Sequence, residues 1–374
     1  MTRVPGLALV LSGGGARASY QVGVLSYIAE RLPHLEIPIM TGVSAGAINI
    51  AYLASHRGTF KERVTSIQGQ WLQLFAENVY RLPPGNILAA GLRWAWHTSF
   101  RRYGGPSSIH GFVDTEPLAR FLSKGIDFDG IKANIKDGSL TAVAFTTTSY
   151  ASGATVTFVD GAPEVEVWRR AQRVAIKTEV GLRHVMASSA LPFIFPAIKL
   201  DDGYYGDGSI RQTAPLSPAV HLGAERILAI AMRSQRPEHL TTAETEMYPT
   251  AAQLMALFFH TIFLDSLDGD VERLQRMNRL IEALPPRTTV PMAMRPVKLL
   301  IVRPSKDLGA LAKGYRYHLP WYVNMVVRSV GGFGERSADF LSYLLFDPEY
   351  TGYLMELGYD DAKAQWDGIE RFLA

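Results

Sequence analysis

Residues 7–17 read LALVLSGGGAR, and residues 37–46 read IPIMTGVSAG. Each segment is a short apolar run that ends in a turn of small residues. Each is followed by residues compatible with a helix, over Ala18–Leu32 after the first turn and over Ala47–Ala54 after the second. A strand, a tight turn and a helix that recur in this order require crossover connections between parallel strands. The sequence therefore predicts an α/β fold with a mostly parallel sheet and helices on its faces.

Further strands and helices are predicted along the rest of the chain. Leu140–Thr147 and Thr155–Val159 are rich in Val, Thr and Phe and flank a turn sequence, which is typical of a hairpin. Two more apolar runs suit buried strands and two longer stretches have helical spacing; these are Arg226–Ala231, Val297–Val302, Ala252–Leu264 and Val271–Leu284.

The composition excludes several classes of protein. The chain has 374 residues, of which 47% are hydrophobic and 20% charged, so it can bury a large core and is not disordered. Lys and Arg number 38 against 35 Asp and Glu, a balance that does not favour a dedicated nucleic-acid-binding protein. Because there are no cysteines, disulfides, a thiol nucleophile and cysteine-bound metals are excluded.

The amino-terminal segment does not have the pattern of a targeting signal. Its apolar run, Leu7–Leu11, is shorter than the hydrophobic region of a signal peptide. The longest later apolar stretch, residues 251–264, is too short for a membrane-spanning helix, which needs about 20 residues. We therefore expect a cytoplasmic chain whose contact with membranes, if there is any, is peripheral.

A G-x-S-x-G sequence, Gly42–Gly46, lies between a predicted strand and a predicted helix. A nucleophile elbow places its serine in a strained strand-to-helix turn, where side chains larger than glycine would collide with the neighbouring backbone. Only small residues surround Ser44, so the pattern suits an activated serine. The alternative is an ordinary serine that caps the following helix.

Three consecutive glycines, Gly13–Gly15, form the first strand-to-helix turn. Their backbone N–H groups are unshielded and precede a helix, which favours an anion site. This site is either a phosphate cradle or an oxyanion hole. As a dinucleotide-binding turn it lacks the last glycine, and Glu36 is the only candidate for the expected acidic residue. Because neighbouring parallel strands end at the same edge of a sheet, we expect this turn to lie beside Ser44.

A serine nucleophile needs a base, and two kinds of candidate are present. Asp207 has a glycine on each side, which would let its short carboxylate approach another loop closely. An aspartate can serve as the base if it stays ionised and within reach of the hydroxyl. Asp201 and Asp202 fit ordinary turn residues better. None of the nine histidines lies in a recognisable catalytic sequence.

Together, Ser12–Arg17, Gly42–Gly46 and Asp207-Gly208 resemble, in order and spacing, the three motifs of the patatin-like phospholipase family. Val113–Leu118 and residues 187–193 support the resemblance, which covers about residues 6–232. It implies a three-layer α/β/α fold and hydrolysis of fatty-acyl esters of lipids, phospholipids included, by a Ser–Asp dyad without histidine. We expect no cofactor or metal.

The resemblance also implies a role for individual residues. Ser44 is expected to be the nucleophile and Asp207 the base, and the backbone N–H groups of Gly13, Gly14 and Gly15 are expected to form the oxyanion hole. Four residues would support them: Arg17, Gly42, Gly46 and Gly208. Two positions depart from the family pattern, Ala18 in place of the more frequent glycine and Ser209 in place of glycine or alanine.

The expected organisation is a catalytic domain over residues 1–232 and a mainly helical region over residues 233–374 that adds one strand near 297–302. Within the first lies an insertion, residues 78–113, that has arginines and aromatic residues but no acid before Asp114. It could contact a membrane surface or form a lid over the site. The expected partner is a lipid or fatty-acyl ester substrate, with no nucleic acid; the sequence does not indicate an oligomeric state.

Two other functions remain open from the sequence. One is a histidine-assisted esterase with the chain order Ser, Asp, His. Its histidine would be one of His221, His239, His260 and His318. The other is a non-catalytic protein that binds a lipid or a nucleotide through the glycine turn alone.

Overall fold

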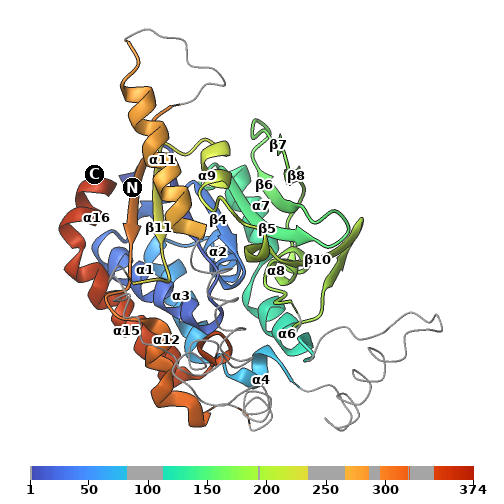
Figure 1. The fold of residues 1–374 in the computed structure, drawn as a ribbon. Coiled ribbons are helices and arrows are strands. Elements are labelled where there is room, and N and C mark those ends of the chain that lie inside the picture. Colours follow the sequence, from blue (N-terminus) through green and yellow to red (C-terminus); the bar gives the residue numbers. More distant parts are fainter. Residues whose placement is uncertain are drawn as a thin grey trace, which may run out of the picture.

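The computed structural model describes residues 2–81, 113–192, 194–234, 266–285, 295–318, 320 and 341–374. The predicted helix Ala252–Leu264 and most of the insertion of residues 78–113 lie outside the described residues. The described chain forms three layers, in which one sheet lies between two layers of helices (Figure 1). This is the α/β/α arrangement that the sequence predicts.

Among the described residues, the central sheet has ten strands, eight of them in the order β12-β11-β2-β4-β5-β6-β8-β7, with β10 and β9 joined to it through β5. The five strands from β12 to β5 are mutually parallel. Their bounds are Lys298–Val302 for β12, Arg226–Ile230 for β11, Leu7–Leu11 for β2, Ile39–Val43 for β4 and Ala142–Ser149 for β5. The other strands are β6 (Thr155–Gly161), β7 (Arg169–Arg170), β8 (Arg173–Lys177), β9 (Ile198–Leu200) and β10 (Gly203–Asp207). A separate parallel pair joins β1 (Thr2–Arg3) to β3 (Leu35–Glu36).

Strand β5 is longer than its neighbour β4, and this difference in length builds the site. β4 pairs with the first part of β5 and ends with Val43 opposite Thr146. β10 runs antiparallel to the remainder of β5 and ends with Asp207 opposite Thr147. Because Thr146 and Thr147 are consecutive, the ends of β4 and β10 meet on the same side of β5.

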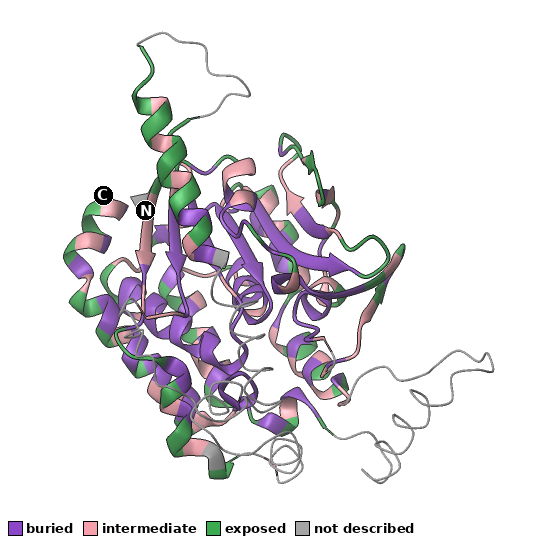
Figure 2. Cartoon of the chain, in the orientation of Figure 1, coloured by how far each residue is buried: buried purple, intermediate pink, exposed green. Residues whose placement is uncertain are grey.

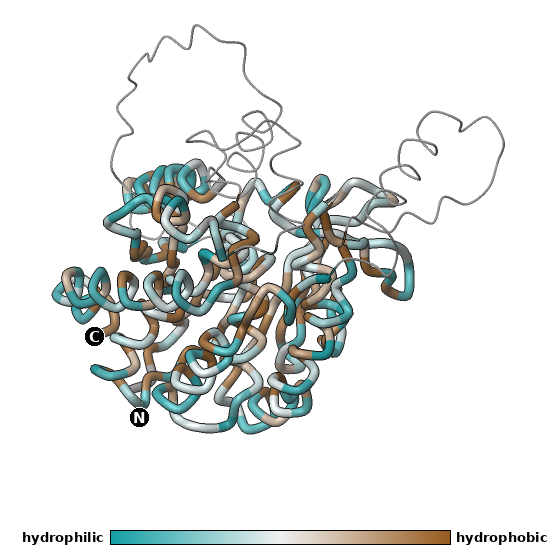
Figure 3. Tube along the Cα trace, turned by 90° about the horizontal axis from the view of Figure 1, so that it is seen from below, coloured by the Kyte–Doolittle hydropathy of each residue, from teal (hydrophilic) through white to brown (hydrophobic). Residues whose placement is uncertain are grey.

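The two faces of the sheet pack against different helices. Alternate residues of β2 point in opposite directions, so Leu7, Leu9 and Leu11 join the larger core, while Ala8 and Val10 join the smaller one. Figure 2 shows the sheet buried between the helical layers. In Figure 3 the apolar residues gather along the interior of the trace and the polar ones on the outer helices.

The larger core lies under helices from both ends of the chain. They include α1 (Ser19–Arg31), α2 (Ala45–Ser55), α3 (Phe60–Leu72), α4 (Ala76–Val79), α6 (Glu116–Gly125), α8 (Leu182–Ser188), α15 (Pro348–Ala364) and α16 (Trp366–Leu373). The smaller core lies under α9 (Ser217–His221) and α11 (Ser266–Glu282). The remaining helical segments are α7 (Phe128–Lys136), α12 (Leu308–Leu311), η1 (Gly15–Ala18), η2 (Gly208–Ile210) and η4 (Ala312–His318).

Most predicted elements are confirmed within one to three residues. The two strand–turn–helix units become β2, η1 and α1, and β4 and α2. The hairpin becomes β5 and β6, which pair antiparallel. The prediction missed β9 and β10, because their three- and five-residue lengths and the glycines of β10 are typical of turn sequence; Asp201 and Asp202 do form the turn between them.

Helix α15 packs directly against α1, so the end of the chain supports its beginning (Figure 1). Gly23 faces the backbone of α15, and a methyl group there would overlap the Met355 carbonyl oxygen. Gly358 is its counterpart, where a methyl group would overlap the Tyr20 carbonyl oxygen. The two helices therefore touch backbone to backbone, which residues larger than glycine would prevent.

We expect Gly23→Ala to lower the free energy of unfolding by about 1–3 kcal/mol, because the added methyl group forces α1 and α15 apart. The control is Gly69→Ala in α3, where no atom lies within 4 Å of the added methyl group. Alanine there should stabilise the helix by about 0.5–1 kcal/mol. Urea unfolding measures both variants, and equal effects would contradict the close contact.

Candidate active site

Ser44 has the backbone conformation of a strained turn. It follows the last residue of β4 and precedes α2, with φ 56° and ψ −133°, a region that non-glycine residues rarely occupy. Such a conformation costs about 1–3 kcal/mol and persists only where the surroundings enforce it. Its side chain makes no capping hydrogen bond to α2, so the helix-cap alternative for this serine is wrong.

The two glycines beside Ser44 let the turn pack closely. A methyl group at Gly46 would overlap the Leu11 carbonyl oxygen at the end of β2, and one at Gly42 would crowd the first turn of α2. The end of β2, and with it the glycine turn, thus lies directly against the start of α2. The expected proximity of the two turns is confirmed.

Ser188, at the end of α8, holds the strained backbone in place. Its hydroxyl accepts a hydrogen bond from the Ser44 N–H at 3.0 Å and donates one to the Thr146 carbonyl oxygen at 2.7 Å. All three residues are buried. The sequence reasoning did not single out Ser188 as a site residue, because its role depends on the end of α8 meeting the turn after β4.

Asp207 ends β10 and is fully buried. Its Oδ1 accepts a hydrogen bond from the Ser209 backbone N–H at 2.9 Å. Burial raises the pKa of Asp207 to about 6, and this rise is opposed by hydrogen bonding with the Ser44 hydroxyl and with Ser209. Its Oδ2 is buried and makes no hydrogen bond of standard geometry among the described residues. The structure thus brings together the two residues expected to form a dyad.

The glycine turn presents free donors beside Ser44. Gly13, Gly14 and Gly15 are buried, and their N–H groups have no hydrogen-bond acceptor in the part of the chain that the structure describes. Buried N–H groups are nearly always paired, so three consecutive unpaired ones point to a ligand atom. Gly15 and Ser44 both line one cavity.

Two of the residues expected to support the site, Gly208 and Arg17, pack closely against neighbouring segments. Gly208 packs so closely on β5 that a methyl group would overlap the Thr146 carbonyl oxygen. Arg17 is buried, donates from Nε to Ser342 Oγ at 2.6 Å and lies 4.3 Å from the ring centre of Tyr343. These contacts hold η1 against residues 341–344.

An apolar cavity opens from Ser44 between α2, α3 and α6. Its walls are almost entirely carbon, with few polar groups besides Ser44, Ser189 and Gln70. The apolar lining includes Ile48, Trp71, Leu118, Leu122, Leu191 and Phe195. A hydrocarbon chain is the kind of group that such walls would bind.

Two of the candidate histidines are engaged elsewhere. His221 stacks on Trp168 with ring centres 4.7 Å apart, and His318 Nδ1 lies 3.1 Å from Asp347 Oδ2. His239 and His260 lie outside the described residues. Among the histidines that are described, none hydrogen bonds to Ser44 or Asp207. The described part of the site therefore does not support the histidine alternative.

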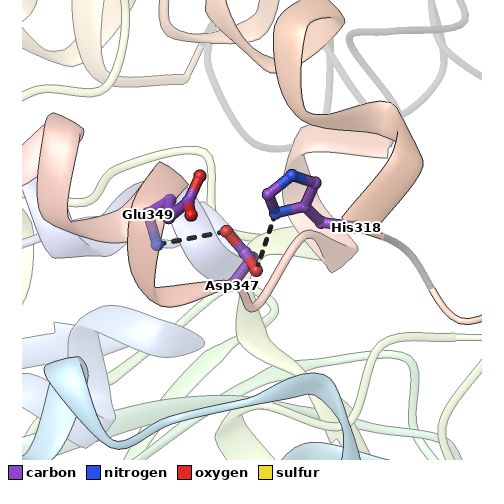
Figure 4. Close-up of side chains that lie close together, drawn as sticks. All are labelled: His318, Asp347 and Glu349. Atoms are coloured by element: carbon purple, nitrogen blue, oxygen red, sulfur yellow. Dashed lines mark hydrogen bonds and ion pairs between the residues drawn. The ribbon is translucent and has the colours of Figure 1, made fainter.

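His318, Asp347 and Glu349 lie close enough together to suggest a cation site (Figure 4). Asp347 Oδ1, however, accepts hydrogen bonds from the backbone N–H groups of Glu349 and Tyr350, and so caps α15. The amino end of a helix carries partial positive charge, which disfavours a cation there. A helix cap with an adjacent contact between a histidine and a carboxylate explains the cluster.

The dinucleotide alternative also fails on geometry. Glu36 precedes β4 and lies at the amino edge of the parallel strands, whereas Gly13–Gly15 follow β2 at the carboxyl edge. The acidic residue that would bind a ribose is therefore at the wrong end of the sheet.

Among the helices that the structure describes, none has the length and hydrophobicity required for a membrane-spanning segment.

Comparison with known proteins agrees with this geometry. The family model for patatin-like phospholipase matches residues 9–220, more than half of the chain. The chain thus belongs to the patatin-like phospholipase family. No curated protein sequence matches at a significant level.

Solved structures that resemble the chain include VipD from Legionella pneumophila, at 12% identity and a TM-score of 0.35, with 98% of this chain and 67% of that one covered. Another is human GIVD cytosolic phospholipase A2 in complex with methyl gamma-linolenyl fluorophosphonate, at 13% identity and a TM-score of 0.43, with 99% and 58% covered. The chain thus spans between about half and two thirds of the length of these structures.

We expect Ser188→Ala to destabilise the protein by about 1–3 kcal/mol, because it leaves the buried Ser44 N–H without an acceptor. Ser26→Ala is the matched control, since the Ser26 hydroxyl bonds only to the Val22 carbonyl within α1. Thermal unfolding should show a clear loss for the first variant and almost none for the second. Equal unfolding temperatures would show that Ser188 does not hold the turn.

Asp207→Asn should stabilise the protein at pH 8. The folded pKa of about 6 exceeds the ordinary value of 3.8, so the folded state binds the proton more tightly. Wild-type stability is therefore lost as pH rises from about 4 to 6, by on the order of 3 kcal/mol, and the neutral variant avoids this loss.

Urea unfolding of both proteins at pH 4 and pH 8 measures the effect, and the difference between them should shrink at the lower pH. Asp201→Asn, in the exposed turn before β10, is the control for removing a negative charge. A wild type that gains stability relative to Asp207→Asn from pH 4 to pH 8 would overturn the assignment.

Proposed function

We propose that this chain hydrolyses fatty-acyl esters of lipids, phospholipids included, through a Ser44–Asp207 dyad and an acyl-enzyme intermediate. The observation that carries the proposal is the juxtaposition of a serine in an elbow conformation, a buried carboxyl and a glycine turn whose N–H groups are unpaired among the described residues, with Ser44 and Gly15 lining an apolar cavity. Membership of the family supports the reaction class.

In the first step, the Ser44 Oγ attacks the ester carbonyl carbon while the Asp207 carboxylate takes the hydroxyl proton. The carbonyl oxygen becomes an oxyanion, and the N–H groups of Gly13, Gly14 and Gly15 would stabilise it. When the tetrahedral species collapses, the C–O bond to the alcohol breaks and Asp207 returns the proton to the leaving oxygen. The fatty-acyl group is then attached to Ser44.

In the second step, water attacks the acyl carbon and gives its proton to Asp207. The bond to Ser44 Oγ breaks, the serine recovers the proton, and the fatty acid leaves. A base is most effective when its pKa lies near the working pH without exceeding it. The raised pKa of Asp207, about 6, makes the carboxylate more basic than an exposed aspartate and leaves it largely ionised at pH 7.

The apolar lining of the cavity, and not its size, supports a hydrocarbon chain as the acyl group. Ile48 lies one turn beyond Ser44 on α2, and Leu118 and Leu122 line the cavity from α6. A chain attached to Ser44 could extend along these residues and leave water. Burial of each methylene contributes about 0.8 kcal/mol, so longer acyl chains should be preferred over acetyl esters.

The test is labelling of the purified protein with a fluorophosphonate, followed by product analysis on phosphatidylcholine vesicles. Wild type should be labelled at Ser44 and should release fatty acid. Ser44→Ala should lose both activities. Asp207→Asn should lose turnover by at least about a hundredfold, because the carboxamide cannot accept the proton.

Circular dichroism and unfolding measurements establish that both variants are folded. Ser26→Ala, away from the site, serves as the active control. Unchanged turnover in Ser44→Ala or in Asp207→Asn would exclude the dyad. Labelling at Ser44 without any released fatty acid would exclude lipid esters as the substrate but retain an activated serine.

A further inference from the structure

We infer that Gln21 is a positioning residue, which orients the Gly13 N–H toward the oxyanion through a chain of hydrogen bonds that begins at Trp71. This inference rests on the proposed function, because it assigns a role in the same site. Gln21 contacts no reacting atom; it acts through the peptide that joins Ser12 to Gly13.

The contact is direct. Gln21, on the first turns of α1, donates from Nε2 to the Ser12 carbonyl oxygen at 2.8 Å. The peptide bonds of the described chain are trans, so the Ser12 carbonyl and the Gly13 N–H lie in one rigid plane and point in opposite directions within it. Holding the carbonyl toward α1 therefore turns the N–H away from α1.

The direction of the chain of hydrogen bonds is fixed by its far end. The indole N–H of Trp71 can only donate, and it donates to Asn49 Oδ1 at 2.9 Å. The amide nitrogen of Asn49 must then face Gln21, whose Oε1 accepts from it at 2.9 Å. This leaves the Gln21 amide nitrogen toward Ser12. A reversed Gln21 amide would place two oxygens against each other.

Burial makes this chain costly to break. Gln21 and Asn49 have no exposed surface, and both lie on helices that are otherwise largely apolar. A buried amide without partners costs about 1–3 kcal/mol. Such groups are retained where every donor and acceptor is satisfied, and in that state they hold a single arrangement.

The glycine turn needs an external support. Gly13–Gly15 have no side chains to fix them, and glycine gives up more backbone freedom on ordering than any other residue. The amide chain holds both ends of the turn, because Asn49 Nδ2 also donates to the Ala18 carbonyl oxygen at 3.0 Å. Trp71 lines the apolar cavity, so the same chain connects the cavity wall to the N–H donors.

The test is Gln21→Met, which removes the donor and keeps a similar volume. We expect kcat on a lipid ester to fall about ten- to a hundredfold with KM nearly unchanged, because the Gly13 N–H matters mainly for the oxyanion. The inhibition constant of a trifluoromethyl ketone, which forms an oxyanion when Ser44 adds to it, should rise by a similar factor.

The matched control is Asn134→Leu, which removes another fully buried amide that donates to backbone carbonyls, those of Ala54 and His56. It should lower the unfolding temperature while keeping kcat and the inhibition constant near wild type. If Gln21→Met does not fold, Asn49→Asp replaces it, since a carboxylate cannot donate to Gln21 and the Gln21 amide would reverse.

The outcomes separate this inference from the proposed function. An inactive wild type would refute the proposed function. An active wild type with an unaffected Gln21→Met would refute the positioning role alone. The role is also refuted if Gln21→Met and Asn134→Leu lose kcat in the same proportion, because a general loss of packing would then explain both.

Discussion

The meeting of β4 and β10 on one side of β5 is the constraint on which the site depends. β5 extends beyond the last residue of β4, and its remaining hydrogen-bonding groups are taken by β10 from the opposite direction. Sheet geometry allows neighbouring strands only fixed spacings and registers. The residue that follows β4 and the last residue of β10 therefore face each other, and these are Ser44 and Asp207.

Both residues are held in states that cost stability. Ser44 has a rare backbone conformation. Asp207 is a carboxyl group removed from water, and the described groups that shift its pKa include no cation. The surrounding structure offsets these costs through Ser188, the Ser209 N–H and the close packing of Gly208 on β5. Strain of this kind is characteristic of sites where reactivity, and not stability, sets the arrangement.

The carboxyl-terminal residues belong to this support as much as the amino-terminal ones do. β12 extends the central sheet and α15 packs on α1. Ser342, within residues 341–344, accepts a hydrogen bond from the buried Arg17 side chain. The glycine turn lies between β2 and α1, so its position depends on contacts from both ends of the chain. The region after residue 232 therefore contributes directly to the framework of the site.

The repeated strand–turn–helix units, the serine elbow and the glycine turn can be predicted from the sequence, because they depend on spacing and on small residues in tight turns; Asp207 was one of two kinds of candidate base, and the family resemblance favoured it. It predicted that Gly13–Gly15 and Ser44 lie together, since parallel strands end at a common edge. Which other side chains complete the site depends on how the helices pack on the sheet. Gln21, Asn49 and Ser188 are polar residues in apolar helices. This pattern indicates that each side chain has a polar partner in the core, but it does not identify the partner. Their partners lie up to 144 residues away, and the packing of helices on the sheet, which local pattern does not specify, determines them.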